Sequence, residues 1–155
     1  IKSVCHTSTD NPSKSLIRQI CYPSAKGFTS EQTEWGCKHA KTAQRSCIET
    51  MRNNHENFRL RESGLVINPS YPFMGATPDG VAPCDCCDEM LVEIKCSFCA
   101  KDFPVSDSVN CLETVDGQLK LKTTHAYYYQ IQFQLLLCEK EYCDFMVWTN
   151  ADTFL

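Results

Sequence analysis

The spacing of apolar residues in the first third of the chain predicts one long helix. The run Gly27-Phe28-Thr29-Ser30 is an N-cap signal, and Glu31 and Glu34 would lie at the positive end of the helix dipole, where acidic side chains are favourable. The helix is therefore predicted from Glu31 to about Asn53. Apolar residues recur along it with a helical period, which predicts an inward stripe made of Trp35, Ala40, Ala43, Cys47 and Met51.

Shorter apolar runs, separated by Gly, Pro, Asn and Ser, predict strands. They are expected at Gly64–Ile67, Met74–Ala76, Gly80–Ala82, Met90–Lys95 and Cys143–Thr149, and Leu119–Leu121 also resembles a strand. Helices are predicted at Ser15–Ile20 and His125–Cys138, whereas residues 1–13 and 100–116 are expected to be irregular. The strands at Gly80–Ala82 and Met90–Lys95 would form a hairpin around a cysteine-rich loop. This order of elements predicts an α/β fold with a central mixed β-sheet flanked by helices.

Length and composition are those of an ordinary globular domain. At 155 residues the chain is long enough for one domain with its own core, and 43% of its residues are hydrophobic. No apolar run approaches the roughly 18 residues that a membrane-spanning helix needs, so no membrane partner is expected. Because the net charge is −4, the molecule as a whole does not attract nucleic acid, and any such site must be a local basic patch.

Twelve cysteines are a large number for a chain of this length. A secreted protein stapled by disulfides is one explanation. We favour reduced thiols in an intracellular protein, nuclear if the source is eukaryotic, because aliphatic residues are ample for a core and the adjacent pair Cys86-Cys87 suits few bridges. A count of free thiols on the denatured, unreduced chain distinguishes the two.

The most informative polar residues are Asp79, Glu93 and Lys95. Side chains alternate between the two faces of a strand, so Glu93 and Lys95 would share one face while Val92 and Ile94 point into a core. The Pro-Asp-Gly turn around Asp79 can bring its carboxylate alongside them. Two carboxylates and an ammonium would then converge, which is what a divalent-metal phosphodiesterase site needs. The alternative is a surface salt bridge between strands.

Four sequence blocks occur in the same order as in a known nuclease family. They are Trp35-Gly36, Thr77-Pro78-Asp79-Gly80, the run Leu91–Phe98 followed by Lys101-Asp102-Phe103, and the run Tyr127–Gln132. The chain thereby resembles the phage lambda exonuclease and YqaJ-type viral recombinase family of the PD-(D/E)xK nuclease superfamily. The resemblance implies a restriction-endonuclease-like core, with residues 1–155 forming a single nuclease domain. It also implies that an N-terminal segment with a phosphate-holding Arg is missing, so 5′-phosphate recognition is not expected of this piece.

The resemblance also implies roles for individual residues. Asp79, Glu93 and the backbone carbonyl of Ile94 would bind Mg²⁺ or Mn²⁺, which are ions that prefer oxygen ligands. Lys95 would orient the attacking water, and Gln130 matches a glutamine that lines the family's active site. The expected function is metal-dependent hydrolysis of DNA, at duplex ends or on single strands, by an exonuclease that serves recombination and repair. Many relatives form ring-shaped oligomers, and an RNA substrate stays open.

The chain departs from the family at one metal ligand. The family has Gly-x-x-x-Glu-x-x-Ala on the first helix, whereas Gly36 is followed here by Ala40, which cannot bind a metal. Three explanations compete. We rank an engineered inactivation first because every other motif element is present; the others are a natural loss and recruitment of another carboxylate, with Glu34 nearest in sequence. The chain is therefore expected to be weak or inactive as a nuclease, and a non-catalytic DNA-binding or scaffolding domain is the alternative function.

Residues before and within the predicted helix His125–Cys138 are candidates for DNA contacts. Lys120, Lys122 and His125 would contact phosphates, although we favour a structural or capping role for His125 taken alone. Of the three consecutive tyrosines at 127–129, at least one is expected in the core, and Tyr128 is the candidate for stacking on a base or ribose. The glutamines of this helix divide: Gln130 and Gln134 share a face, but we interpret Gln132 and Gln134 as surface polar residues.

Five cysteines lie close together in sequence and supply enough thiolates for a tetrahedral zinc site, namely Cys84, Cys86, Cys87, Cys96 and Cys99. The intervening strand, however, would span on the order of 16 Å and separate the first three from the last two, whereas zinc binds sulfur at about 2.3 Å. We therefore favour packed free thiols over a structural zinc ion.

Overall fold

Strand β4 (Met90–Cys96) is the central strand of the sheet. In the computed structural model, which describes residues 1–22 and 30–155, the strand order is β3–β4–β7–β8. β3 (Gly80–Ala82) pairs antiparallel with β4, and β7 (Cys143–Trp148) runs parallel to it on the other side. β8 (Thr153–Phe154) then closes the second edge, antiparallel to β7. The sheet is therefore mixed, as the sequence predicted.

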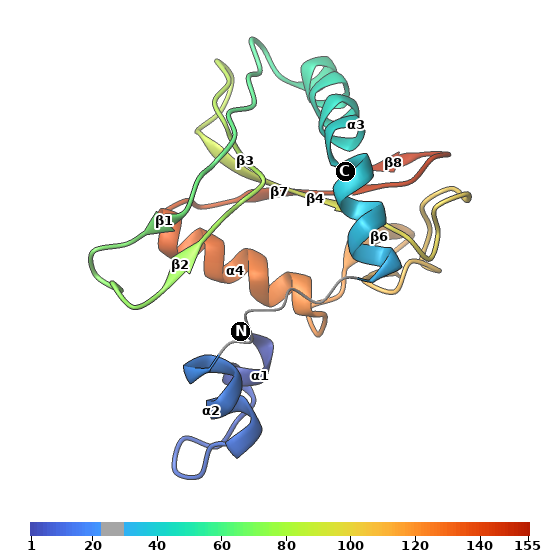
Figure 1. Cartoon of the computed structure of the whole chain (residues 1–155). Coiled ribbons are helices and arrows are strands. Elements are labelled where there is room, and N and C mark those ends of the chain that lie inside the picture. The colour runs from blue at the N-terminus through green and yellow to red at the C-terminus, as the bar shows by residue number, and fades with distance from the viewer. Residues whose placement is uncertain (23–29) are drawn as a thin grey trace.

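Two helices cover opposite faces of this sheet (Figure 1). A parallel pair of strands needs a long crossover, and the crossover from β4 to β7 contains α4 (Ala126–Cys138). The other face is covered by α3 (Glu31–Asn54). Alternation along β4 decides what meets each helix: Val92 joins the core under α3, whereas Glu93 points toward α4. The predicted α/β fold, a mixed sheet flanked by helices, is confirmed.

Helix α3 begins where the sequence predicted. The Ser30 hydroxyl accepts a hydrogen bond from the backbone N–H of Thr33 at 3.2 Å, and the rest of the expected cap, residues 27–29, lies outside the described residues. Its fully buried residues, Ala43, Cys47 and Met51, all lie in its C-terminal half. The prediction that Ala40 belongs to this inward stripe is wrong, because Ala40 is exposed and lines an open hollow, whereas Trp35 and His39 on the same helix pack against Trp148 of the sheet.

A separate hairpin precedes α4. β5 (Leu112–Val115) pairs antiparallel with β6 (Gln118–Leu121) around Asp116 and Gly117, whose φ angles are 53° and 76°. Positive φ at both central residues is what a two-residue turn of type I′ requires, and Asp-Gly is a preferred sequence for it. The prediction that residues 100–116 are irregular is therefore wrong over β5, whose Leu112 is fully buried in a second core cluster.

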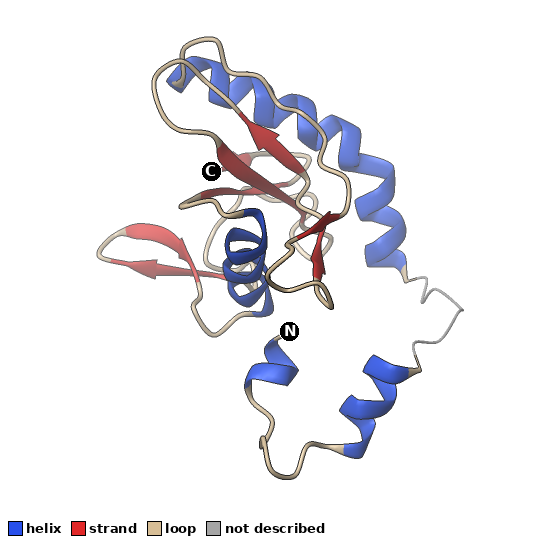
Figure 2. Cartoon of the chain, turned by 90° about the vertical axis from the view of Figure 1, so that its left-hand side faces the viewer, coloured by secondary structure: helices blue, strands red, loops and turns tan. Residues whose placement is uncertain are grey.

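The remaining elements lie around α4. A short ribbon of β1 (Val66–Ile67) and β2 (Gly75–Ala76) contacts it. Figure 2 shows α1 (Lys2–Cys5) and α2 (Lys14–Cys21) apart from the sheet, on the side of α4. α1 lies within residues 1–13, so the prediction that this whole segment is irregular is wrong. The residue after α1, His6, forms a hydrogen bond through Nε2 with the Tyr129 hydroxyl of α4 at 2.9 Å. No helix in the described ranges is long and apolar enough to cross a membrane.

Candidate active site

Asp79 lies immediately before β3, at the point where pairing with β4 stops. β3 begins at Gly80, opposite Val92, so the backbone of Ile94 extends past the end of its neighbour. The Asp79 Oδ2 takes the place of a strand partner and accepts a hydrogen bond from the Ile94 N–H at 2.8 Å. A residue in a strand directs its N–H and its C=O to the same edge, so the Ile94 carbonyl faces the edge at which Asp79 lies.

Glu93 is a buried carboxylate with donors on both oxygens. It is 2% exposed. Its Oε1 accepts a hydrogen bond from Gln130 Nε2 at 2.6 Å and forms an ion pair with Lys95, while its Oε2 accepts from Gln134 Nε2 at 2.9 Å. A buried charge is costly unless it is paired and hydrogen-bonded, and these donors meet that need. They also fix the direction in which the carboxylate points.

Lys95 is held between this carboxylate and an aromatic ring. Its Nζ lies 4.7 Å from the centroid of the Tyr127 ring. Tyr127 in turn packs against Phe145 of the second core cluster, so it is one tyrosine of the three that reaches the core. The ammonium therefore has a defined position, with partners on two sides.

The surroundings of Asp79 disfavour its charged form. The residue as a whole is exposed, but its carboxyl group lies among buried neighbours, and this burial raises its pKa. The charge of Glu93 raises the pKa further, whereas the Ile94 N–H and Lys95 lower it. Two nearby carboxylates, one of them buried, together with a backbone carbonyl form a hard oxygen donor set. That donor set fits Mg²⁺ or Mn²⁺.

These groups open onto a hollow of about 650 Å³, here called the Asp79 hollow. Asp79, Ile94, Lys95 and Tyr127 form one wall. Residues of α3, Ala40 among them, also line the hollow. Glu62 also lines it. The backbone of its neighbour Arg61 pairs with Val81 of β3, and this pairing holds Glu62 near the site. Glu34 is not among the lining residues. Sequence reasoning missed Glu62, since no local pattern marks it.

One of the three glutamines of α4 differs from its predicted position. Gln132 is exposed, as expected. Gln134 was interpreted as a surface residue, and that was wrong: it is 2% exposed and bonds to Glu93. It shares this face with Gln130 because the two are one helical turn apart. Its Oε1 is buried and has no hydrogen-bond partner among the described residues.

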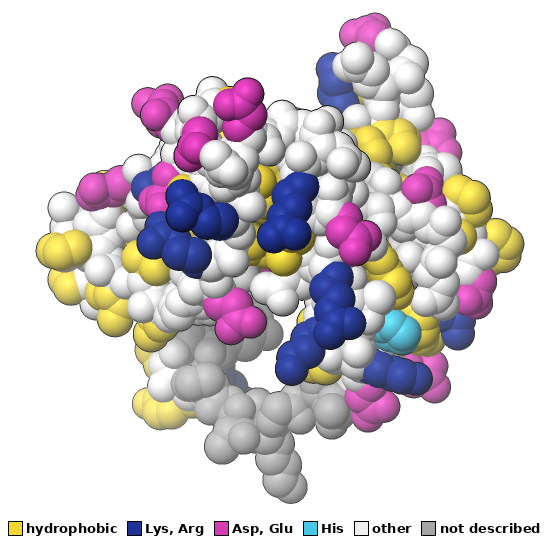
Figure 3. All heavy atoms as spheres, turned by 90° about the horizontal axis from the view of Figure 1, so that it is seen from above, with side chains coloured by type: hydrophobic (Ala, Val, Ile, Leu, Met, Phe, Trp, Pro, Cys, Tyr) yellow, Lys and Arg dark blue, Asp and Glu magenta, His cyan; other side chains and the backbone are white. Residues whose placement is uncertain are grey.

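The candidates for DNA contacts are spread more widely. Lys120 lies opposite Glu113 in the β5–β6 hairpin, and Lys122 Nζ donates to the Asn110 carbonyl at 2.9 Å. His125 caps α4, since its Nδ1 accepts from the Tyr127 N–H at 3.2 Å, and it lines a second hollow together with Lys95. Tyr128 is half-buried beside Tyr129. Figure 3 shows basic side chains in separate groups with acidic ones between them. DNA contact by these residues stays a prediction.

The cysteines separate into groups. All twelve have free thiols, and all lie in the described ranges. Cys96 and Cys99 line the second hollow with Cys111. Cys84, Cys86 and Cys87 instead gather around His55, a residue that the sequence argument did not consider. The five cysteines therefore do not form one joint site.

The chain matches one known protein family over most of its length. Residues 1–141 match the YqaJ-like viral recombinase domain, and the chain belongs to this family. An uncharacterised protein of Acanthamoeba polyphaga mimivirus is 30% identical over 97 residues, which are 63% of this chain and 17% of that protein.

Two solved structures share the fold. The alkaline exonuclease LHK-Exo of Laribacter hongkongensis has a TM-score of 0.64 at 21% identity, and the match covers 97% of this chain and 68% of that one. LHK-Exo in complex with dAMP has a TM-score of 0.65 at 20% identity, covering 97% and 66%. The chain thus spans about two thirds of the exonuclease and a small part of the mimivirus protein.

Proposed function

We propose that this domain is a divalent-metal-dependent deoxyribonuclease that hydrolyses phosphodiester bonds at DNA ends, for resection in recombination. The observation that carries the proposal is the convergence of Asp79, Glu93 and Lys95 at the end of β3, where Asp79 and Lys95 line the Asp79 hollow and Glu93 is buried behind them. The names of its relatives support it, because one is a viral recombinase domain and another is an exonuclease whose structure contains dAMP.

The chain's own residues would divide the work. Asp79, Glu93 and the Ile94 carbonyl would hold Mg²⁺ or Mn²⁺, which polarises a phosphoryl oxygen and acidifies a bound water. Lys95 would orient the attacking water and offset the negative charge that develops on the phosphate. Gln130 and Gln134 would act as positioning residues, because they hold Glu93 in one orientation.

Ala40 limits what this chain can do. It lines the same hollow as Asp79 and Lys95, and its methyl group cannot bind a metal ion. We therefore infer that the chain is a weak nuclease. A non-catalytic DNA-binding domain is the second candidate, and the same alanine favours it. Glu62, which lines the same hollow, offers a third possibility, in which a carboxylate from elsewhere completes the site.

Cleavage of end-labelled linear duplex DNA with Mg²⁺ or Mn²⁺ tests these alternatives. Second-shell partners of a metal are commonly worth about 10–100-fold, so a ligand added directly by Ala40→Glu is expected to raise cleavage at least tenfold. Adding Lys95→Ala to that variant should abolish the gain. Lys38→Ala, which removes an exposed lysine outside the hollow, is the matched control and should not.

Each alternative has its own result. If Ala40→Glu folds and binds DNA but does not cleave it, the domain is a scaffold and the nuclease proposal is wrong. If the unaltered chain already cleaves and Glu62→Gln removes that activity, Glu62 completes the site and Ala40 is not a defect.

A further inference from the structure

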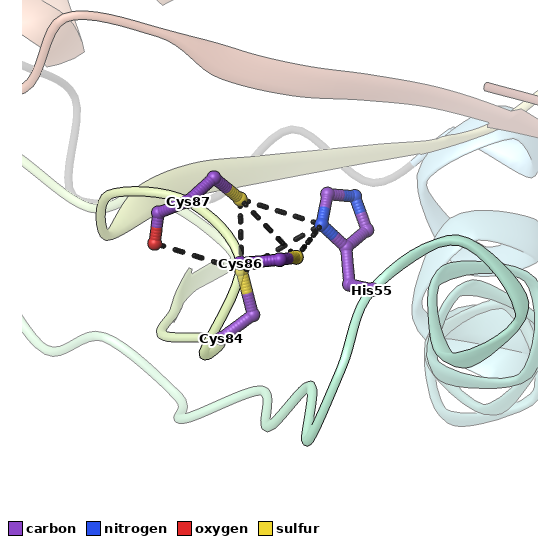
Figure 4. A group of neighbouring side chains, drawn as sticks. All are labelled: His55, Cys84, Cys86 and Cys87. Carbon is purple, nitrogen blue, oxygen red and sulfur yellow. Dashed lines mark hydrogen bonds between the residues drawn. The ribbon is translucent and has the colours of Figure 1, made fainter.

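A second side-chain cluster lies at the other end of the β3–β4 hairpin from Asp79. His55 directly follows α3, and Cys84, Cys86 and Cys87 belong to the loop between β3 and β4. All four side chains point toward one another (Figure 4). Their potential ligand atoms lie within 4.8 Å of one another.

The backbone holds the two segments together independently of the cysteines. The Arg59 N–H donates to the Pro83 carbonyl at 3.1 Å, and the Asp85 N–H donates to the Glu56 carbonyl at 2.9 Å. The Asn57 side chain adds a hydrogen bond to the Asp85 carboxylate at 2.6 Å. The loop is thus fastened beside the end of α3, which places three thiols around one imidazole.

The six distances among the four atoms describe a tetrahedron. The His55 Nδ1 is 3.6 Å from the Cys84 sulfur and 3.4 Å from each of the other two. The sulfurs are separated by 2.8 Å (Cys84–Cys87), 3.6 Å (Cys84–Cys86) and 4.0 Å (Cys86–Cys87). A tetrahedral zinc with bonds of about 2.3 Å to sulfur and about 2.0 Å to nitrogen gives edges of about 3.8 Å and about 3.5 Å. All but one of the observed edges are within a few tenths of an ångström of these values.

Hydrogen bonding alone does not account for this arrangement. An imidazole nitrogen that is not protonated accepts a hydrogen bond through one lone pair, yet three thiols converge on the same Nδ1. A central cation that binds three thiolates and the nitrogen accounts for all four positions.

We propose that His55, Cys84, Cys86 and Cys87 bind a structural zinc ion, which fastens the end of α3 to the β3–β4 loop. Three soft thiolates and an imidazole suit zinc and not Mg²⁺ or Ca²⁺. Four protein ligands leave no open position, which is typical of structural and not of catalytic zinc. On binding, the thiols lose their protons to solvent. The site does not depend on the nuclease proposal, because none of its residues lines the Asp79 hollow.

Metal analysis of the whole chain tests the site. Protein purified with a reductant and without chelators is expected to carry one zinc per chain. Exchange into Co²⁺ in the presence of excess Mg²⁺ should give the strong visible absorption of tetrahedral cobalt, with thiolate charge-transfer bands in the near ultraviolet. Cys86→Ser and His55→Ala should lose most of the bound zinc, whereas Cys99→Ser, which removes an exposed thiol elsewhere, should keep it.

His55→Cys covers the case in which the other variants do not fold. It should retain one zinc and shift the cobalt spectrum to that of four thiolates. The proposal is overturned if the unaltered chain binds no zinc and gives no tetrahedral cobalt spectrum. It is equally overturned if His55→Cys leaves that spectrum unchanged. A mass of the denatured, unreduced chain that is lower by two hydrogens, because Cys84 and Cys87 form a disulfide, would also overturn it.

Discussion

At the scale of single residues, Asp79 should lower the stability of the metal-free domain. Its folded-state pKa lies above the ordinary value because of burial and of Glu93, so ionisation of this carboxyl group destabilises the fold. That cost is present above the folded pKa and disappears as the pH falls toward the unfolded value. Asp79→Asn should therefore raise the free energy of unfolding at pH 7, with the difference closing in acid.

Urea unfolding at a series of pH values, in buffer without divalent ions, measures this effect. Asp107→Asn is the control, because Asp107 is exposed and lies outside the site. If Asp79→Asn is less stable than the unaltered chain at pH 7, then the hydrogen bond to Ile94 outweighs the cost of the charge, and the electrostatic account of the site is wrong.

Some of these residues could be found from the sequence, and others could not. The alternation of a strand places Glu93 and Lys95 on one face, and a turn before the hairpin brings Asp79 near, so local rules suffice for those three. Gln134, Glu62 and His55 depend on how separate elements pack. Nothing within α4 shows that Gln134 faces a buried carboxylate.

At the scale of elements, α4 controls the orientation of Glu93. Gln134→Met keeps the volume of the side chain but removes the donor to Oε2. Leaving a buried acceptor without its partner costs about 1–3 kcal/mol, and more when the acceptor is charged, so unfolding should become easier by at least that amount. Gln132→Met is the matched control on the same helix and should change stability by less than about 0.5 kcal/mol, because Gln132 is exposed.

Chemical denaturation of the two variants side by side decides the point. Equal stabilities would mean that water replaces the glutamine and that α4 does not fix the carboxylate. The nuclease assay on an Ala40→Glu background provides a second readout, since only the Gln134 change should lower cleavage.

The elements themselves were predictable to different degrees. α3 and α4 each begin at a capping side chain and β4 is a continuous apolar run broken by Glu93 and Lys95, and the predicted bounds of all three agree with those in the structure to within one residue. β5 has only four residues, and its signal is the Asp116-Gly117 turn that follows it rather than its own pattern. β8 has two residues and is defined by pairing with β7, which local sequence does not encode.

At the scale of the whole molecule, the sheet with α3 and α4 forms the part on which the site depends. Its two core clusters lie on opposite faces of β4 and β7, and Asp79 is held at the edge that β3 leaves open. The helices α1 and α2 contain no buried residue. They therefore contribute little to the core that positions the site.

Removal of residues 1–22 should leave the rest of the domain folded. The truncation loses two exposed hydrogen bonds, from His6 to Tyr129 and from Lys2 to the Thr124 carbonyl, and because each is worth about 1 kcal/mol, the free energy of unfolding should fall by about 2 kcal/mol. The slope of urea unfolding should change little, because it follows the buried surface and these helices bury none of their own residues. His6→Ala in the full chain should reproduce about half of the loss, because the bond of Lys2 to Thr124 remains. If the truncated protein instead unfolds without a cooperative transition while His6→Ala does not, the two helices complete the core, and the site depends on them as well.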